Sequence, residues 1–210
     1  MGEETNSEVT EILAEFILAM ADDELILAHR NSEWTGHAPI LEEDIAFSNI
    51  AQDELGHATL WYQILSDITG DEPDELVFFR DSNAYRNIQM VELPNGDWAY
   101  SLMRQFLFDA YESIWLAALT GSLYKPIAEV SKKIWHEEIY HYRHTTNWIK
   151  RLGLGTKESN RRCQSALDQL WPYSFQLFRA KPEERLILEL GYTTDRVDVR
   201  ESWITLVVPF

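Results

Sequence analysis

Two Glu-x-x-His motifs are the residues of this sequence best suited to chemistry. They run from Glu54 to His57 and from Glu138 to His141. In a helix this spacing places a carboxylate and an imidazole on one face, one turn apart, where both can reach the same metal ion. A chain rich in glutamate produces some such motifs by chance, so their position decides whether they carry meaning.

Both motifs fall on apolar stripes that repeat at helical spacing. The steps along each stripe alternate between four and three residues, which keeps its members on one face of a helix. One stripe reads Ile50, Glu54, His57, Trp61, Ile64, Ile68, and the other reads Ile127, Ser131, Ile134, Glu138, His141, Thr145, Trp148. The polar pairs are therefore expected to face the core.

Two further apolar stripes carry one acid each near the middle, Glu24 on the first and Asp109 on the second. One acid from each of two helices and a Glu-x-x-His from each of two others is the ligand pattern of di-iron carboxylate bundles. Glu112, one turn after Asp109, is an alternative ligand from the same helix. Asp53 and Glu137 each precede a predicted ligand and could orient a histidine, although solvent-facing acids are commoner at such positions.

Charge gives a physical reason to expect metal at these residues. Four carboxylates in an apolar core are costly unless they are neutralised or protonated, whereas two divalent cations balance their charge with the histidines neutral. Carboxylate and imidazole ligands suit iron or manganese. The alternative is that the acids form buried hydrogen-bonded pairs or face water. The predicted ligands are Glu24, Glu54, His57, Asp109, Glu138 and His141.

Long helices are needed to position these ligands, and the apolar spacing predicts four of them, with almost no strand-like alternation. A connection of about 25 residues between the second and third helices is too long for a hairpin but suits the crossover of ferritin-like bundles. The prediction is an all-α, ferritin-like four-helix bundle with a helical C-terminal extension, in a single domain over 1–210. The helices are expected near 7–31, 40–69, 96–121 and 126–152, and the extension over about 157–210, interrupted by Pro172 and Pro182.

Composition limits the partners and the compartment. The chain carries 35 acidic and 18 basic residues, a net charge of −17, which repels phosphate backbones and anionic membranes. Neither nucleic acid nor a membrane is expected as a partner. Cys163 is the only cysteine, so no intramolecular disulfide can form, and no signal peptide is visible. We therefore expect a cytoplasmic protein.

Longer segments resemble a known family. They are Asp22-Asp23-Glu24, Glu33-Trp34-Thr-Gly36-His37-Ala-Pro39, Asp53-Glu54-Leu-Gly56-His57, Phe79-Arg80-Asp81 and Pro94-Asn95-Gly96-Asp97. On these residues the chain resembles the phenylacetyl-CoA epoxidase family of phenylacetate degradation, most closely its C-type (PaaC) subunit, from about residue 20 to about residue 175. The Glu-Trp-x-Gly-His-Ala-Pro segment is far more specific than a Glu-x-x-His motif.

The resemblance implies a subunit of a multicomponent monooxygenase. In that family ferritin-like A-type and C-type subunits pair, a reductase supplies electrons, and the ring of a CoA ester, phenylacetyl-CoA, is epoxidised with oxygen. The C-type partner is described as structural, whereas a di-iron site lies in the A-type subunit, on residues that match the six predicted here. Keeping all six implies an oxygen-activating di-iron subunit; the alternative is a non-catalytic subunit that stabilises a catalytic partner. Iron storage by an unrelated ferritin-like protein is a further alternative.

Overall fold

Four long helices form the framework of the computed structural model, which describes residues 2–210 and their side chains from residue 7 onward. They are α1 (Gly2–Ser32), α2 (Leu41–Thr69), α5 (Trp98–Leu119) and α6 (Lys125–Gly153). These bounds lie within about one and a half turns of the predicted ones. The described residues contain no strand, so the all-α prediction is confirmed, and none of their helices is long and apolar enough to cross a membrane.

Shorter helices fill the crossover and the C-terminal extension. The crossover contains α3 (Pro73–Phe78), η1 (Ser82–Ala84) and α4 (Gln89–Glu92). The extension contains α7 (Lys157–Ser174), η2 (Phe175–Phe178), η3 (Pro182–Glu184), α8 (Arg185–Glu189) and α9 (Arg196–Val207). The predicted interruption at Pro172 is wrong, because this proline lies inside the last turn of α7.

Local sequence explains where these helices begin and end. Gly70 closes α2 in the left-handed conformation (φ 81°), and its N–H donates to the Ser66 carbonyl oxygen at 2.8 Å. The Asp97 carboxylate accepts a bond from the Tyr100 N–H at the start of α5. At the start of α7, Thr156 and Ser159 form a reciprocal capping box.

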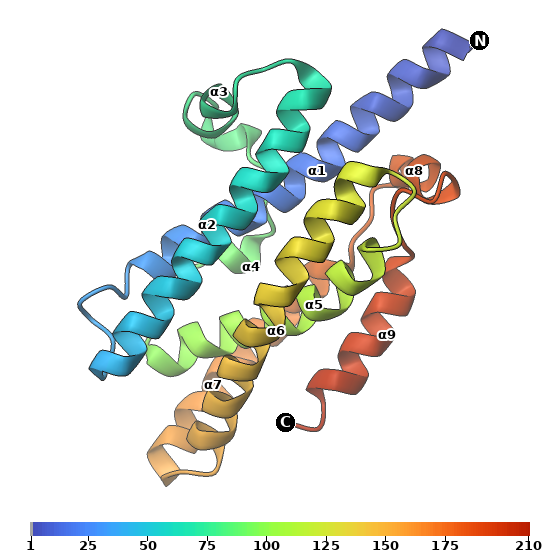
Figure 1. The fold of residues 1–210 in the computed structure, drawn as a ribbon. Coiled ribbons are helices and arrows are strands. Elements are labelled where there is room, and N and C mark those ends of the chain that lie inside the picture. Colours follow the sequence, from blue (N-terminus) through green and yellow to red (C-terminus); the bar gives the residue numbers. More distant parts are fainter. Residues whose placement is uncertain (1) are drawn as a thin grey trace.

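The long helices associate as two pairs, α1 with α2 and α5 with α6 (Figure 1). Contacts between the pairs are fewer, and those between α2 and α6 bring the two Glu-x-x-His motifs together. The helices α7 and α9 pack on α5, so α5 is covered on most sides. One cluster of buried apolar side chains extends from Leu13 in α1 to Val207 in α9.

A buried ion pair attaches the crossover to the first helix pair. The Asp22 carboxylate, fully buried in α1, accepts bonds from the Arg80 guanidinium at 2.5 and 3.0 Å and from the Tyr62 hydroxyl at 2.5 Å. It also accepts the Arg86 backbone N–H at 2.7 Å. A charge-assisted cluster of this kind is strongly position-specific, so it fixes the path of the chain between α2 and α5.

The C-terminal extension covers the bundle. Trp203 of α9 is completely buried, its indole N–H donates to the Leu107 carbonyl oxygen at 3.1 Å, and its ring stacks on Trp171 at 5.2 Å between centroids. An indole buried in this way contributes both apolar area and a satisfied hydrogen bond. The extension therefore belongs to the same hydrophobic core as the four helices.

Candidate metal centre

Five of the six predicted ligands meet in two groups of closely spaced donor atoms. The first group is Glu24, Glu54, His57 and Glu112, and the second group is Glu54, Glu138 and His141. In each group the donor atoms lie within 4.8 Å of one another, and every one of these residues is buried. Glu54 belongs to both groups: its Oε2 faces His57 Nδ1 at 3.6 Å and its Oε1 faces His141 Nδ1 at 3.8 Å.

Unpartnered buried atoms point into the first group. Both oxygens of Glu24, the Oε2 atoms of Glu54 and Glu112, and Nδ1 of His57 have no hydrogen-bond partner in the structure. Buried polar atoms are normally satisfied, because each unsatisfied one costs about 1–3 kcal/mol. Several such atoms converging from three helices are what a metal ion would satisfy.

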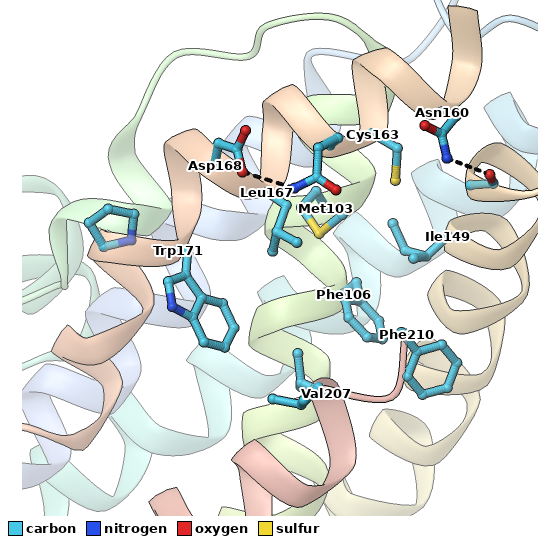
Figure 2. Close-up of a pocket in the computed structure, with 14 residues that line it drawn as sticks. Met103, Phe106, Ile149, Asn160, Cys163, Leu167, Asp168, Trp171, Val207 and Phe210 are labelled. Atoms are coloured by element: carbon cyan, nitrogen blue, oxygen red, sulfur yellow. Dashed lines mark hydrogen bonds between the residues drawn. The ribbon is translucent and has the colours of Figure 1, made fainter. Parts of the chain in front are cut away.

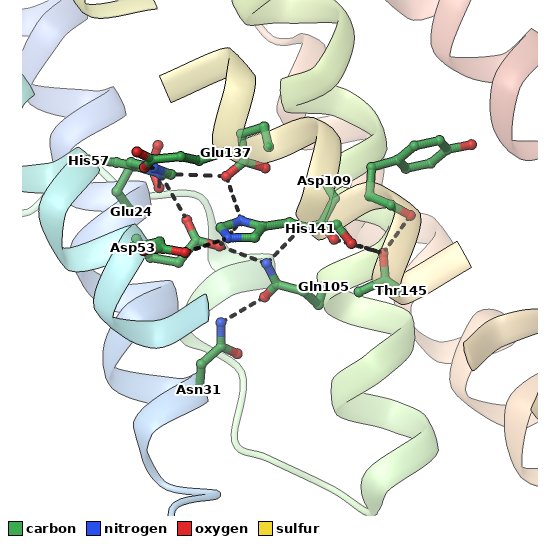
Figure 3. A network of polar contacts seen from close by, with 12 residues as sticks. Glu24, Asn31, Asp53, His57, Gln105, Asp109, Glu137, His141 and Thr145 are labelled. Carbon is green, nitrogen blue, oxygen red and sulfur yellow. Dashed lines mark hydrogen bonds and ion pairs between the residues drawn. The ribbon is translucent and has the colours of Figure 1, made fainter. Parts of the chain in front are cut away.

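The two histidines are held crosswise by acids from the opposite motif. His57 of α2 bonds through Nε2 to Glu137 of α6 at 2.8 Å, and His141 of α6 bonds through Nε2 to Asp53 of α2 at 3.1 Å (Figure 3). Each bond leaves the Nδ1 atom facing the cluster. The side chains of Asp53 and Glu137 are 43% and 45% exposed, so these acids lie at the outer edge of the site. They orient the imidazoles as carboxylates commonly do behind metal-bound histidines.

The structure places Asp109 beside the cluster and Glu112 within it. Asp109 is fully buried, but its Oδ1 accepts from Gln105 Nε2 at 2.6 Å and its Oδ2 accepts from the Thr145 hydroxyl at 2.7 Å. Glu112, the alternative noted from the sequence, lies in the first group with an unpartnered Oε2. The closely spaced donor atoms of the described residues thus include Glu112 from α5 and not Asp109.

Gln105 is the central residue that the sequence reasoning missed. It is completely buried, its amide Nε2 donates both to Glu54 Oε1 at 2.7 Å and to Asp109 Oδ1, and its Oε1 accepts from Asn31 Nδ2 at 2.8 Å. Figure 3 shows this chain of bonds running from α1 through α5 toward the histidines. Gln105 and Asn31 are neither titratable nor common ligands, so a search for ligand types passes over them.

Burial governs the charge of the cluster. It raises the pKa of Glu24 well above the ordinary value, and the neighbouring carboxylates of Glu112 and Glu54 raise it further. Burial likewise raises the pKa values of Asp109 and Glu112. Burial alone would also raise the pKa of Glu54, but the adjacent imidazoles, His57 foremost, lower it to about 2. The chain alone thus gathers more carboxylates than its two imidazoles can neutralise, which favours proton or cation uptake.

The donor set fits a hard or borderline divalent ion. It consists of carboxylate oxygens and imidazole nitrogens, and Cys163, the only thiol, lies elsewhere, in α7. Oxygen and nitrogen donors of this kind suit iron and manganese, and two divalent ions would balance four carboxylates. The residues present therefore fit the metals expected from the sequence.

An apolar hollow lies apart from this cluster. It has a volume of about 490 Å³ and is bounded by side chains of α5, α6, α7 and the C-terminal residues, among them Phe106, Trp171 and Phe210 (Figure 2). No histidine or glutamate lines it. It therefore offers no paired acid and imidazole, unlike the cluster between the four long helices.

Fold and site together define a ferritin-like helical bundle with a buried cluster of carboxylates and histidines. The chain belongs to the phenylacetic acid catabolic protein family, whose model matches residues 1–210. It is also 35% identical over 192 residues to the C subunit of 1,2-phenylacetyl-CoA epoxidase from Escherichia coli (strain K12). The matched region covers 91% of this chain and 77% of that relative. The resemblance to the C-type subunit is thus confirmed.

Proposed function

We propose that this chain is a metal-binding, ferritin-like subunit of a phenylacetyl-CoA epoxidase-type monooxygenase, in which it pairs with an A-type ferritin-like subunit served by a reductase. The similarity to an epoxidase C subunit along most of the chain supports the assembly. The unpartnered donor atoms of the buried cluster support metal binding. Iron is the expected metal, with manganese possible.

The side chains divide the work of such a site. Glu24, Glu54, His57, Glu138 and His141 would hold two ions, with Asp109 or Glu112 completing the set from α5. Glu54 would serve both groups of donors, because its two oxygens face different histidines. When bound, reduced iron would supply the activation of dioxygen that ring epoxidation requires.

The protein's own part is to exclude water and to fix protonation. The ligands are at most 5% exposed, so bulk water is kept from the cluster. Asp53 and Glu137 accept from the Nε2 atoms of the histidines, so the Nδ1 atoms face the cluster; Nδ1 of His57 is unpartnered, whereas Nδ1 of His141 is bonded to Glu138 Oε1. A raised carboxyl pKa, as at Glu24, means that such a group releases its proton when an ion binds.

A second candidate function is a non-catalytic structural subunit that stabilises a catalytic partner. Two observations favour it. The similarity is to an epoxidase C subunit. In the second group, His141 is already bonded to Glu138, and Glu54 already accepts from Gln105. A cytoplasmic location and a CoA ester as substrate stay predictions under either function.

Reconstitution separates the two candidates. The chain is expressed in iron-replete medium, its metal content is measured, and it is mixed with an A-type subunit and the reductase. We expect a heteromer burying more than about 1,000 Å². Loss of epoxidation when Glu54→Ala and Glu138→Ala are placed in this chain alone supports the catalytic role; full activity of that heteromer supports the structural role. Absence of both metal and heteromer contradicts the proposal.

A further inference from the structure

We propose that Gln105 makes the two donor groups unequal, so that a first divalent ion binds in the first group and a second ion must displace the Gln105 amide. This inference rests on the proposed metal binding, because it concerns the order in which the cluster takes up ions. It assigns a role to a residue that is not itself a ligand. If the inference holds, the two ions bind one after the other rather than together.

The first group is open to an ion without rearrangement. Glu24 offers two unpartnered oxygens, and Glu54, His57 and Glu112 each offer one unpartnered atom toward the same space. His57 Nδ1 lies 3.6 Å from both Glu24 Oε2 and Glu54 Oε2, slightly beyond hydrogen-bond distance. An ion here forms contacts and breaks none that the structure shows.

The second group is already satisfied by bonds within the protein. His141 Nδ1 is bonded to Glu138 Oε1 at 2.8 Å, and its Nε2 is bonded to Asp53. Glu54 Oε1, the oxygen that faces His141, is occupied by Gln105 Nε2 at 2.7 Å. Of the donor atoms in this group that are not shared with the first, only Glu138 Oε2 is unpartnered.

Gln105 acts in the second group as a fixed substitute for a cation. One amide nitrogen bonds to two carboxylates, Glu54 and Asp109, where an ion would otherwise balance their charge. The amide cannot turn away easily, because Asn31 Nδ2 holds its oxygen at 2.8 Å and the side chain is completely buried. Hydrogen bonds to charged groups are stronger than neutral ones, so a second ion must overcome them.

Titration with manganous ion tests this order. Free Mn²⁺ is followed by its electron paramagnetic resonance signal while the full-length chain is titrated, and ion positions are located by anomalous scattering at low and high Mn²⁺. We expect one tight step with the first ion beside His57 and Glu112, followed by a step at least roughly tenfold weaker beside His141. Exchange coupling between neighbouring ions should appear only at the second step.

Substitution of the amide is the decisive comparison. Gln105→Leu, similar in size but without a donor, should tighten the second step roughly 10- to 100-fold, the factor that corresponds to one hydrogen bond to a charged group. Thr145→Val is the matched control: it removes the other donor to Asp109 and leaves Glu54 bonded, so the second step should change much less. Asn31→Leu, which only frees the Gln105 amide, should shift the step in the same direction by less.

The outcomes are distinguishable from failure of the proposed function. Two equal steps in the unsubstituted chain, or a first ion beside His141, overturn the role of Gln105 while leaving metal binding intact. Absence of any bound ion overturns the proposed metal site itself. If Gln105→Leu does not fold, Asn31→Leu decides: an unchanged gap between the two steps then rejects the inference.

Discussion

Glu112 and Asp109 are the two candidate ligands on α5. We predict opposite effects on metal affinity and stability when each is changed to its amide. Glu112→Gln keeps the side-chain volume but removes one of the four carboxylate or imidazole donors of the first group. Changes behind a ligand already cost roughly 10- to 100-fold in affinity, so loss of a ligand should weaken the first Mn²⁺ step by at least about 100-fold. The fold should tolerate this change, because Glu112 Oε2 has no partner to lose.

Asp109→Asn should do the reverse. The new amide replaces a carboxylate whose two oxygens accept from Gln105 and Thr145, so one bond is lost or weakened, at a cost of about 1–3 kcal/mol. For a chain of this size that corresponds to a fall of roughly 2–10 °C in Tm. The first Mn²⁺ step should stay within about threefold of its original affinity, since all four members of the first group remain.

The assays are a far-ultraviolet circular-dichroism melt for stability and a Mn²⁺ titration for affinity, made on both variants and the unsubstituted chain. Glu112→Gln should lose affinity and keep its Tm, and Asp109→Asn should lose Tm and keep its affinity. The opposite pattern, in which Asp109→Asn abolishes the first step and Glu112→Gln leaves it unchanged, would refute the placement of Glu112 in the first group.

Three further predictions follow from the same contacts. Glu137→Gln should weaken metal binding roughly 10- to 100-fold by releasing His57, whereas Glu129→Gln, an exposed acid on the same helix, should leave the titration unchanged. Trp203→Ala should destabilise the chain by about 3–5 kcal/mol in a denaturant melt, and a value near that of the exposed control Val197→Ala, within about 0.5 kcal/mol of zero, would count against the extension as part of the core. Because the pKa values of Glu24, Asp109 and Glu112 are raised on folding, their contribution to stability is present below the unfolded pKa values and lost as pH rises through the folded ones. An ion replaces those protons, so the gain in Tm on adding Mn²⁺ should grow between about pH 5.5 and about pH 8, and a gain that shrinks over this interval would be inconsistent with the cluster as the binding site.

The long helices and most residues of the buried cluster could be predicted because each lies on a single apolar stripe. On α2 and α6 one face is buried and the other is exposed, so the stripe containing Glu54 or Glu138 shows in the sequence. On α5 the pattern fails: α7 and α9 cover its outer side, and almost every residue from Ala99 to Glu112 is buried. With no exposed face to set the register, the sequence favoured Asp109 and could not show that Glu112 lies closer to the other donor atoms.

The side-chain contacts between helices could not be predicted from the sequence, for a different reason. The positions of Asp53 and Glu137 suggested that they could orient a histidine, but each bonds to the histidine of the opposite helix, which depends on how α2 packs on α6. The ion pair between Asp22 and Arg80 joins residues 58 positions apart in the sequence. Contacts between residues so far apart in the chain leave no periodic pattern in the local sequence.

The pairing of α1 with α2 and of α5 with α6 has a consequence for how the molecule assembles. Each pair joins helices that are neighbours along the chain, so either hairpin can begin to form through contacts that are local in sequence. The ligands, however, are divided: Glu24, Glu54 and His57 come from one hairpin, and the remaining donors come from the other. Neither hairpin alone contains all the proposed ligands, so an ion cannot guide the folding of either hairpin by itself.

Under the proposed metal binding, an ion would be captured at the docking step, late on the folding pathway, when the buried acids of the two hairpins approach each other. Repulsion between their acids opposes that encounter, and protonation or an available cation lowers the barrier. Chains synthesised under iron limitation should therefore linger as loosely docked hairpins. Cellular iron supply would then set how much of the protein matures, before it sets any catalytic rate.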